Sequence, residues 1–478
     1  MRGTRPAAAV FALCVVVSVA RAAAEDANPV IAEALRAIGA DSLTSITYSG
    51  TAAQGNFGQS RTITFGIAST SIRNYTRTID FTTSTARTTG DTLPPAVRGG
   101  PPPQPGKLDQ TIAADAPWVQ QHQIWVTPWG FLRGAAANHA SVRSQKIDGE
   151  TYRVVTWTTP QKAPSGLPYK VVGYVNGNNL VERVETWIDH PVLGDEHREF
   201  VYSDYRDFGG VKAPLRTTQK QVGMDTFVAV ISTARANPPD LAALLTPPAG
   251  AARAAPAPPA PAATTSQKLA DGVYRITGGY VSMAVEFRDF IVVLEGGESE
   301  ARGQAILAET KRLFPNKRIK YVVNTHPHFD HASGLAPFVA EGITIRADDN
   351  AKYFLEAALG TPRTLVGDTL AKSKKKPKVE GVVEKQVVTD GMHTLELHHV
   401  AGLDHSDSML IAYLPKEKIL FCADFRLPTG QPDPSLVTLG DNIERLHLDF
   451  DRVVMVHAPN PDRPVTRADL LGPVKGTN

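Results

Sequence analysis

The segment spanning residues 325–331, Thr-His-Pro-His-Phe-Asp-His, constrains this chain more than any other. It follows the run 319–324, whose β-branched and aromatic residues predict a buried strand that ends before Pro327. Four side chains of the segment can bind a metal: His326, His328, Asp330 and His331. Imidazoles suit zinc, and a carboxylate beside them adds a hard oxygen ligand. On a tight loop the first two can point one way and the last two another, so the segment predicts a loop that serves two neighbouring metals. A His-rich surface loop is the alternative interpretation.

Three further metal-capable residues follow in the chain, each after a strand-like run. They are His405 after residues 395–400, Asp424 after residues 418–423 and His457 after residues 452–456. This set and order resemble the signature of the metallo-β-lactamase superfamily, and the resemblance covers residues 267–478. It implies an αββα sandwich, and the alternation of strand-like and helical runs in this half fits two sheets between helices.

The resemblance also implies how the ligands are shared between two metals. The first metal would be bound by His326, His328 and His405, the second by Asp330, His331 and His457, and Asp424 would bridge both. Two zinc ions are implied, with iron or manganese as alternatives, and the nucleophile would be a hydroxide held between them. Asp330 would accept a hydrogen bond from that nucleophile, which makes it the predicted catalytic residue.

The residue at the bridging position narrows the reaction. Where this chain has Asp424, one group of true β-lactamases has Cys and another has Ser, whereas Asp resembles thioester, lactone, sulfatase and phosphodiester hydrolases of the superfamily. The prediction is a metal-dependent hydrolase of an ester, thioester, lactone or sulfate-ester bond. The alternatives are a β-lactamase acting on antibiotics, a lipid- or partner-binding protein, and a mononuclear iron persulfide dioxygenase, for which seven ligands are too many. If the strand continues, Arg426 lies on the same face as Asp424 and meets an anionic substrate group; a surface ion pair is the alternative.

A spacer of Ala and Pro divides the chain, whose 478 residues are too many for one ordinary core. We predict an N-terminal domain over residues 25–246, a linker over 247–266 and the metallo-β-lactamase-like domain over 267–478. The first domain is expected to be a mostly antiparallel β domain, because strand-like runs such as 61–65 alternate in polarity. Residues 202–214 resemble the strand-turn-strand of lipoprotein-carrier-like half-barrels, which leaves a lipid or protein contact through this domain open.

The first 24 residues predict a bacterial-type signal peptide, with basic Arg2 and Arg5, an apolar stretch and small residues before the cleavage site. The stretch is too short to span a bilayer comfortably, so we expect a periplasmic or secreted protein without stable membrane insertion. A net charge of +2 gives no reason to propose nucleic acid, and a small molecule is the expected substrate. The oligomeric state is left open. Cys422, in an apolar run, is predicted to be a core residue.

Overall fold

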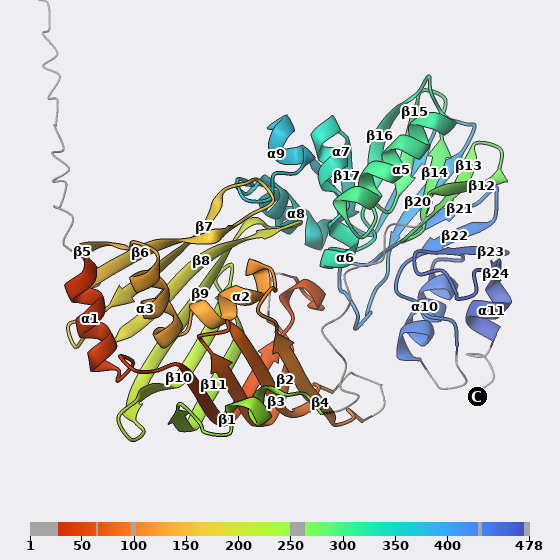
Figure 1. The fold of residues 1–478 in the computed structure, drawn as a ribbon. Coiled ribbons are helices and arrows are strands. Elements are labelled where there is room, and N and C mark those ends of the chain that lie inside the picture. Colours follow the sequence, from red (N-terminus) through yellow and green to blue (C-terminus); the bar gives the residue numbers. More distant parts are fainter. Residues whose placement is uncertain (1–26, 64–65, 97–101, 249–262, 429–432, 473–478) are drawn as a thin grey trace, which may run out of the picture.

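The computed structural model describes residues 27–63, 66–96, 102–248, 263–428 and 433–472. The predicted signal peptide (1–24) and most of the predicted linker (249–262) lie outside the described residues. A large sheet forms the N-terminal half, and a mixed α/β domain forms the C-terminal half (Figure 1). Within the described ranges, no helix is long and apolar enough to cross a membrane.

The N-terminal half is one antiparallel sheet of 11 strands in the order β4-β3-β2-β1-β11-β10-β9-β8-β7-β6-β5, which confirms the predicted β domain. Its strands are β1 (Ser45–Gly55), β2 (Ser69–Asp80), β3 (Thr85–Leu93), β4 (Gly106–Ile112), β5 (Ser141–Ile147), β6 (Glu150–Lys162), β7 (Pro168–Val175), β8 (Val181–His190), β9 (Gly194–Asp207), β10 (Lys212–Gln221) and β11 (Met224–Ala236). The helices of this half are α1 (Ala27–Ala37), α2 (Trp118–Trp125), α3 (Pro128–Ala137) and α4 (Leu241–Leu245). The sheet curves, and α1, α2 and α3 lie on its concave side (Figure 1).

Tryptophans join these helices to the sheet. Trp118 on α2 and Trp129 on α3 are buried in one apolar cluster with Trp157 of β6. The rings of Trp118 and Trp157 pack edge to face, with centroids 6.2 Å apart. Such aromatic side chains bury large apolar areas, which explains why two short helices hold their position on the sheet.

The expected strand at residues 61–65 is not formed. Residues 61–62 make a bend that continues into a turn at Ile63, and residues 64–65 lie outside the described part of the chain. The backbone oxygen of Arg61 accepts a hydrogen bond from the backbone nitrogen of Asp407 at 2.9 Å, and the Thr62 hydroxyl donates to the Asp407 carboxylate at 2.7 Å. The polar groups that a strand would pair with a neighbour are therefore used between the two halves of the molecule.

The C-terminal half contains two sheets, one of seven strands in the order β12 to β18 and one of six strands in the order β19 to β24. Their strands are β12 (Thr265–Ala270), β13 (Val273–Thr277), β14 (Ser282–Glu286), β15 (Phe290–Leu294), β16 (Arg318–Val323), β17 (Thr344–Asp348), β18 (Val379–Val382), β19 (Lys385–Thr389), β20 (Thr394–His399), β21 (Leu410–Leu414), β22 (Ile419–Cys422), β23 (Arg452–Met455) and β24 (Val465–Thr466). The helices are α5 (Glu300–Leu313), α6 (Phe329–Ala332), α7 (Ala336–Glu341), α8 (Asp349–Gly360), α9 (Thr369–Ser373), α10 (Pro434–Arg445) and α11 (Arg467–Leu471).

Apolar side chains of both sheets form the core between them, including Met283, Leu294, Leu397 and Phe421. Helices α5, α7 and α8 cover the first sheet, and α10 and α11 cover the second (Figure 1). This arrangement is the predicted metallo-β-lactamase fold.

Parallel strands bring the predicted ligands to one edge. Strands β15 to β18 are parallel, as are β22 and β23. The loops that follow β16, β22 and β23 carry six of the seven predicted ligands, and in open α/β sheets ligands bind at such carboxyl ends. The seventh, His405, lies in the loop after β20.

The two halves share an apolar core. Phe57, Ile63, Val192 and Leu193 of the N-terminal half are buried in the same cluster as the residues of α5, α7 and α8. The 3₁₀ helix η1 (Phe57–Gln59) contacts α6, the helix of the predicted metal loop. The N-terminal half is therefore in direct contact with the predicted site.

Candidate metal centre

The structure brings all seven predicted ligands together in two groups. One group consists of His326, His328, His405 and Asp424, and the other of Asp330, His331 and His457. In each group, one candidate ligand atom per residue lies within 4.8 Å of the others. The grouping is the one that the resemblance implied.

A single helical turn after a strand explains how one loop supplies both groups. Strand β16 ends at Val323, and α6 begins at Phe329, directly after His328. The backbone nitrogen of His331 donates to the His328 oxygen at 2.9 Å, and the Asn324 side chain donates to the His331 oxygen at 3.0 Å. The extended part of the loop thus presents the first two histidines, and the turn presents Asp330 and His331.

Asp424 lies between the two groups. Its Oδ2 atom is 2.6 Å from His405 Nε2 and 3.1 Å from His326 Nε2. Its Oδ1 atom is 3.2 Å from His331 Nε2 and also contacts His457 Nε2. Asp424 has a φ of +58°, in the left-handed region that Asp tolerates better than most side chains. One carboxylate oxygen therefore faces each group, as a bridging ligand requires.

The donor set fits metal ions that prefer nitrogen and oxygen. His326 Nε2 is 3.0 Å from His328 Nδ1 and 3.3 Å from His405 Nε2, so ring nitrogens of three histidines converge. In the second group, Nε2 of His331 and Nε2 of His457 both face Asp424 Oδ1. Converging imidazole nitrogens beside a carboxylate are the ligand pattern of zinc and related metals.

Burial sets the charge of these groups. It lowers the pKa of His326 well below its ordinary value and the pKa of His328 to about 4, so both imidazoles are neutral, as metal ligation requires. Burial raises the pKa of Asp424, but hydrogen bonds from His326, His331 and other histidines outweigh it and keep this carboxylate ionised. For His331, burial lowers the pKa, but Glu295 and Asp424 together raise it to about 10.

Glu295 is a supporting residue that the sequence analysis missed. It is fully buried at the end of β15 with a φ of +70°, and its Oε2 atom is 2.6 Å from Thr325 Oγ1 and 3.2 Å from His331 Nδ1. This contact turns His331 Nε2 towards Asp424, in the way outer-shell carboxylates orient ligating histidines. An acidic residue closing an apolar strand was the signal that could have identified it.

Asp330 is held by two residues that were also missed. The Tyr280 hydroxyl donates to Asp330 Oδ2 at 2.8 Å, and Gln59 Nε2 donates to Asp330 Oδ1 at 2.6 Å. The Tyr280 ring also packs against His457, with centroids 4.4 Å apart. Burial raises the pKa of Asp330, but His331 and these hydrogen bonds outweigh it and lower the pKa. Asp330 is therefore ionised and fixed in orientation.

Besides Gln59, the N-terminal half supplies a second hydrogen bond that orients a predicted metal ligand. His328 Nε2 donates to the backbone oxygen of Ser60 at 3.2 Å, which leaves Nδ1 facing the first group. The Phe57 ring packs edge to face on Phe329, with centroids 5.7 Å apart. No sequence signal could have found these contacts, since Ser60 and His328 are 268 positions apart.

The structure bears differently on the predictions for Arg426 and Cys422, the two residues singled out near Asp424. The condition on which the expectation for Arg426 rested is not met, because β22 ends at Cys422 and the left-handed conformation of Asp424 interrupts strand alternation. Arg426 is exposed, and its contact with a substrate group stays a prediction. Cys422 is a core residue, as predicted: it is fully buried, and burial raises the pKa of its thiol to about 12.

The fold and the two groups define a metallo-β-lactamase-type domain. Residues 277–457 match the family model of the metallo-beta-lactamase superfamily. Among solved structures, the chain is similar to a metallo-beta-lactamase from Pontibacter korlensis (18% identity, covering 45% of this chain and 100% of that chain, TM-score 0.34). It is also similar to the metallo-beta-lactamase FIM-1 from Pseudomonas aeruginosa in its mono-zinc form (16% identity, covering 46% of this chain and 96% of that chain, TM-score 0.35). A third similar structure is a metallo-beta-lactamase from Hirschia baltica (17% identity, covering 44% of this chain and 96% of that chain, TM-score 0.33). A comparison with curated proteins finds no match.

Proposed function

We propose that the protein is an exported, dinuclear zinc-dependent hydrolase that acts on an ester, thioester, lactone or sulfate-ester bond of a small molecule. The observation that carries this proposal is the position of Asp424, which turns one carboxylate oxygen to each of the two groups. The candidate site and the family match together favour a catalytic role of the metals over a purely structural one. Structural zinc sites are usually closed and four-coordinate, whereas this site offers seven candidate ligands in two groups.

The residues of the site have distinct roles in such a reaction. The first metal would be held by His326, His328 and His405, the second by Asp330, His331 and His457, with Asp424 between them. When bound, a zinc pair supplies an activated water at neutral pH and stabilises the negative charge that develops on the substrate. Asp330, ionised and held by Tyr280 and Gln59, can accept a hydrogen bond from the attacking water. Glu295 keeps His331 in the orientation that ligation needs.

Asp424 also bears on the substrate. A carboxylate at this position adds negative charge between the metals, and it does not supply the soft thiolate that one β-lactamase class places there. We therefore expect β-lactams to be at best minor substrates.

A panel of substrates tests this proposal. The values of kcat/KM for a penicillin, a cephalosporin and a carbapenem are compared with those for aryl esters, thioesters, a lactone and aryl sulfates. The proposal expects at least one ester-type substrate to exceed every β-lactam. A β-lactam turned over well above all of them would show a β-lactamase instead. Persulfide oxygenation by protein that carries one iron would show the dioxygenase alternative.

The place of action is part of the proposal. The basic and apolar pattern of residues 1–24 supports export, so the substrate would be met in the periplasm or outside the cell. A contact of the N-terminal domain with a lipid or a partner is the second candidate function, and a cavity in that domain favours a bound small molecule.

A further inference from the structure

A cavity of about 660 Å³ lies in the N-terminal half, against the concave face of the sheet. Its walls come from β1 to β4, from β9 to β11, and from the segment that joins α2 and α3. Binding pockets for small molecules span roughly 300–1,000 Å³, so this cavity is large enough for one. None of the seven predicted metal ligands lines it.

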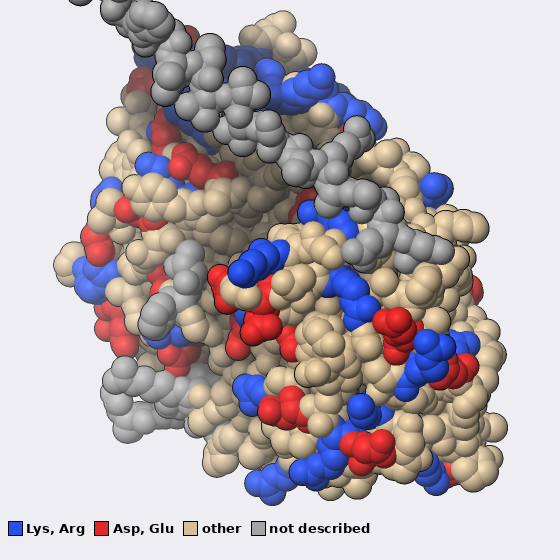
Figure 2. Space-filling view, turned by 90° about the vertical axis from the view of Figure 1, so that its left-hand side faces the viewer, with Lys and Arg blue, Asp and Glu red and all other residues tan. Residues whose placement is uncertain are grey.

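The charged residues that line the cavity are all basic. They are Arg77 and Arg198, and no Asp or Glu is among the described lining residues. Acidic and basic residues are interspersed on the outer face shown in Figure 2, so one sign of charge is a property of the cavity and not of that surface. Burial lowers the pKa of His190, a third lining residue, to about 3, and this histidine is therefore neutral.

The two arginines differ in their partners. Arg198 contacts the carboxylate of Glu196, a fully buried residue outside the lining. Arg77 is 8% exposed, and its guanidinium donates to Thr88 Oγ1 at 2.9 Å and to the Gln123 backbone oxygen at 3.2 Å. Among the residues that the structure describes, no carboxylate forms an ion pair with Arg77. A guanidinium has five N–H donors, so several remain for a ligand.

Nearby tyrosines do not supply the missing negative charge. Tyr48 and Tyr75 line the same cavity, and burial raises the pKa of both hydroxyls. Both stay protonated at neutral pH. A buried charge without a counter-charge is costly, so the site is arranged for an anion that arrives from solution.

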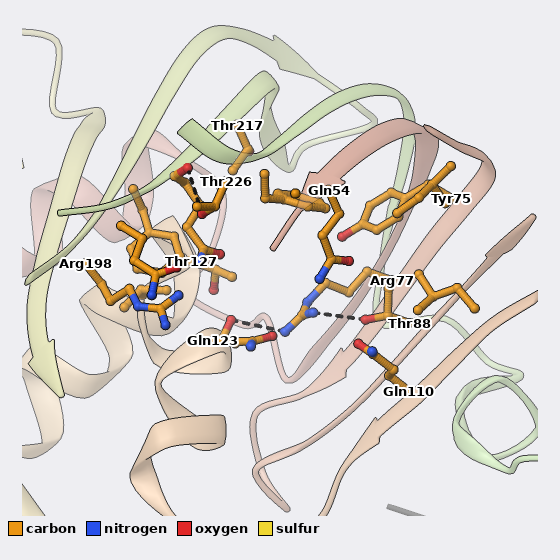
Figure 3. A pocket seen from close by; sticks show the side chains of 18 of the residues that line it. Gln54, Tyr75, Arg77, Thr88, Gln110, Gln123, Thr127, Arg198, Thr217 and Thr226 are labelled. Atoms are coloured by element: carbon orange, nitrogen blue, oxygen red, sulfur yellow. Dashed lines mark hydrogen bonds between the residues drawn. The ribbon is translucent and has the colours of Figure 1, made fainter. Parts of the chain in front are cut away.

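Uncharged donors and an aromatic wall complete the cavity. The side chains of Gln54, Gln110 and Gln123 surround the Arg77 guanidinium (Figure 3), and their amides have no hydrogen-bond partner within the described part of the chain. Tyr48 and Trp129 pack with ring centroids 5.8 Å apart on another side. The glutamine amides can donate hydrogen bonds to the polar group of a ligand, and the rings of Tyr48 and Trp129 can contact its apolar part.

We propose that this cavity binds a small monoanion, a carboxylate with an aromatic or alkyl body, whose charged group pairs with Arg77. One unpaired guanidinium matches one negative charge. The cavity wall also includes Phe329, which lies between His328 and Asp330, so the occupant lies against the loop that carries predicted metal ligands. The proposal does not depend on which bond the metal centre hydrolyses.

Three probes of similar shape test the charge requirement: phenylpropionate, phenylpropionamide and phenylpropylamine. Their dissociation constants for the full-length protein are measured by calorimetry, with intrinsic tryptophan fluorescence as a second readout. The carboxylate is expected to bind about tenfold or more tightly than the neutral amide, since a charge-assisted hydrogen bond contributes more than a neutral one. The amine is expected to bind weakest. Equal binding of carboxylate and amide, or no binding of any probe, would overturn the proposal.

Variants of one strand locate the site. Arg77→Gln should weaken the carboxylate about tenfold and leave the amide nearly unchanged, and Arg77→Lys should keep part of the preference. Arg73→Gln is the matched control, because Arg73 is exposed on β2 and does not line the cavity. If both Gln variants bind the carboxylate as the unaltered protein does, the carboxylate binds elsewhere, for example at the metal centre, and the proposal is wrong. Thermal unfolding of each variant shows whether it is folded.

Discussion

The metal centre and the N-terminal cavity are opposite in charge. The first gathers five histidines and two aspartates, with the buried acid Glu295 behind them. The second contains two arginines and no acidic lining residue within the described chain. In the first region, ring nitrogens of three histidines converge on one another, and in the second, part of the Arg77 guanidinium has no carboxylate partner among the described residues. Converging imidazole nitrogens indicate a cation in one region, and an unpaired buried charge indicates an anion in the other.

The two regions also differ in how far they depend on each other. The seven candidate ligands all come from the C-terminal half, but Gln59 and Ser60 of the N-terminal half contact two of them. The cavity belongs to the N-terminal half, and Phe329 is the lining residue that comes from the metal loop. The segment around η1 therefore lies at the boundary of both regions, which makes it the place to test whether they are coupled.

The largest effect is expected from Asp424→Ala. The unaltered protein should bind about two zinc ions per chain, and the variant should lose metal and hydrolysis together, by more than the roughly 10–100-fold typical of supporting residues. Elemental analysis and kcat/KM on the best ester measure this. Asp441→Ala, at an exposed position of α10, is the control. A variant that keeps both metals would contradict the bridging role, and phenylpropionate binding should be unaffected.

A smaller effect is expected from Gln59→Ala. Loss of the hydrogen bond to Asp330 should weaken the second metal by about tenfold without removing the first. Competition with a chelator gives the two affinities separately. Gln104→Ala is the control, since Gln104 is exposed and bonds only to its own loop. Unchanged affinities in the Gln59 variant would show that the N-terminal half covers the centre without supporting it.

An effect on stability and not on metal binding concerns pH and the positive field near the cavity. His122 is 1% exposed, and burial, with a further contribution from Arg198, lowers its pKa from 6.5 to about 3. Below pH 6.5, His122 is therefore protonated in the unfolded chain but stays neutral in the folded chain. Because the unfolded state binds more protons, the free energy of unfolding falls as the pH drops below 6.5. Between pH 7 and pH 5 this histidine should account for a loss of about 2 kcal/mol.

Chemical unfolding at the two pH values measures that loss. His122→Gln should lower stability at pH 7 but reduce the difference between pH 7 and pH 5, because Gln does not titrate. His139→Gln, at an exposed position, should leave the difference unchanged. An identical pH dependence in both variants would mean that His122 titrates normally in the folded protein.

The sequence alone predicted the candidate metal ligands and the fold that presents them. Strand ends can be recognised from apolar runs, and a ligand loop directly after such a run needs only local geometry, as His326 after β16 shows. The antiparallel N-terminal sheet was also predictable, because alternating polarity is a local pattern. Helices α2 and α3 were not, since both are short and their tryptophans gave no clear helical period.

Only the tertiary structure decided the environment of these groups. Glu295, Tyr280 and Gln59 reach the site from segments far apart in the chain, and their spacing carries no periodic signal. The strand does not continue to Arg426 because the backbone turns at Asp424, a conformation that the sequence pattern does not reveal. The unpaired Arg77 became visible only when every neighbouring carboxylate could be located. Local patterns follow from short-range backbone geometry, whereas the partner of a buried charge depends on which distant segments packing brings together.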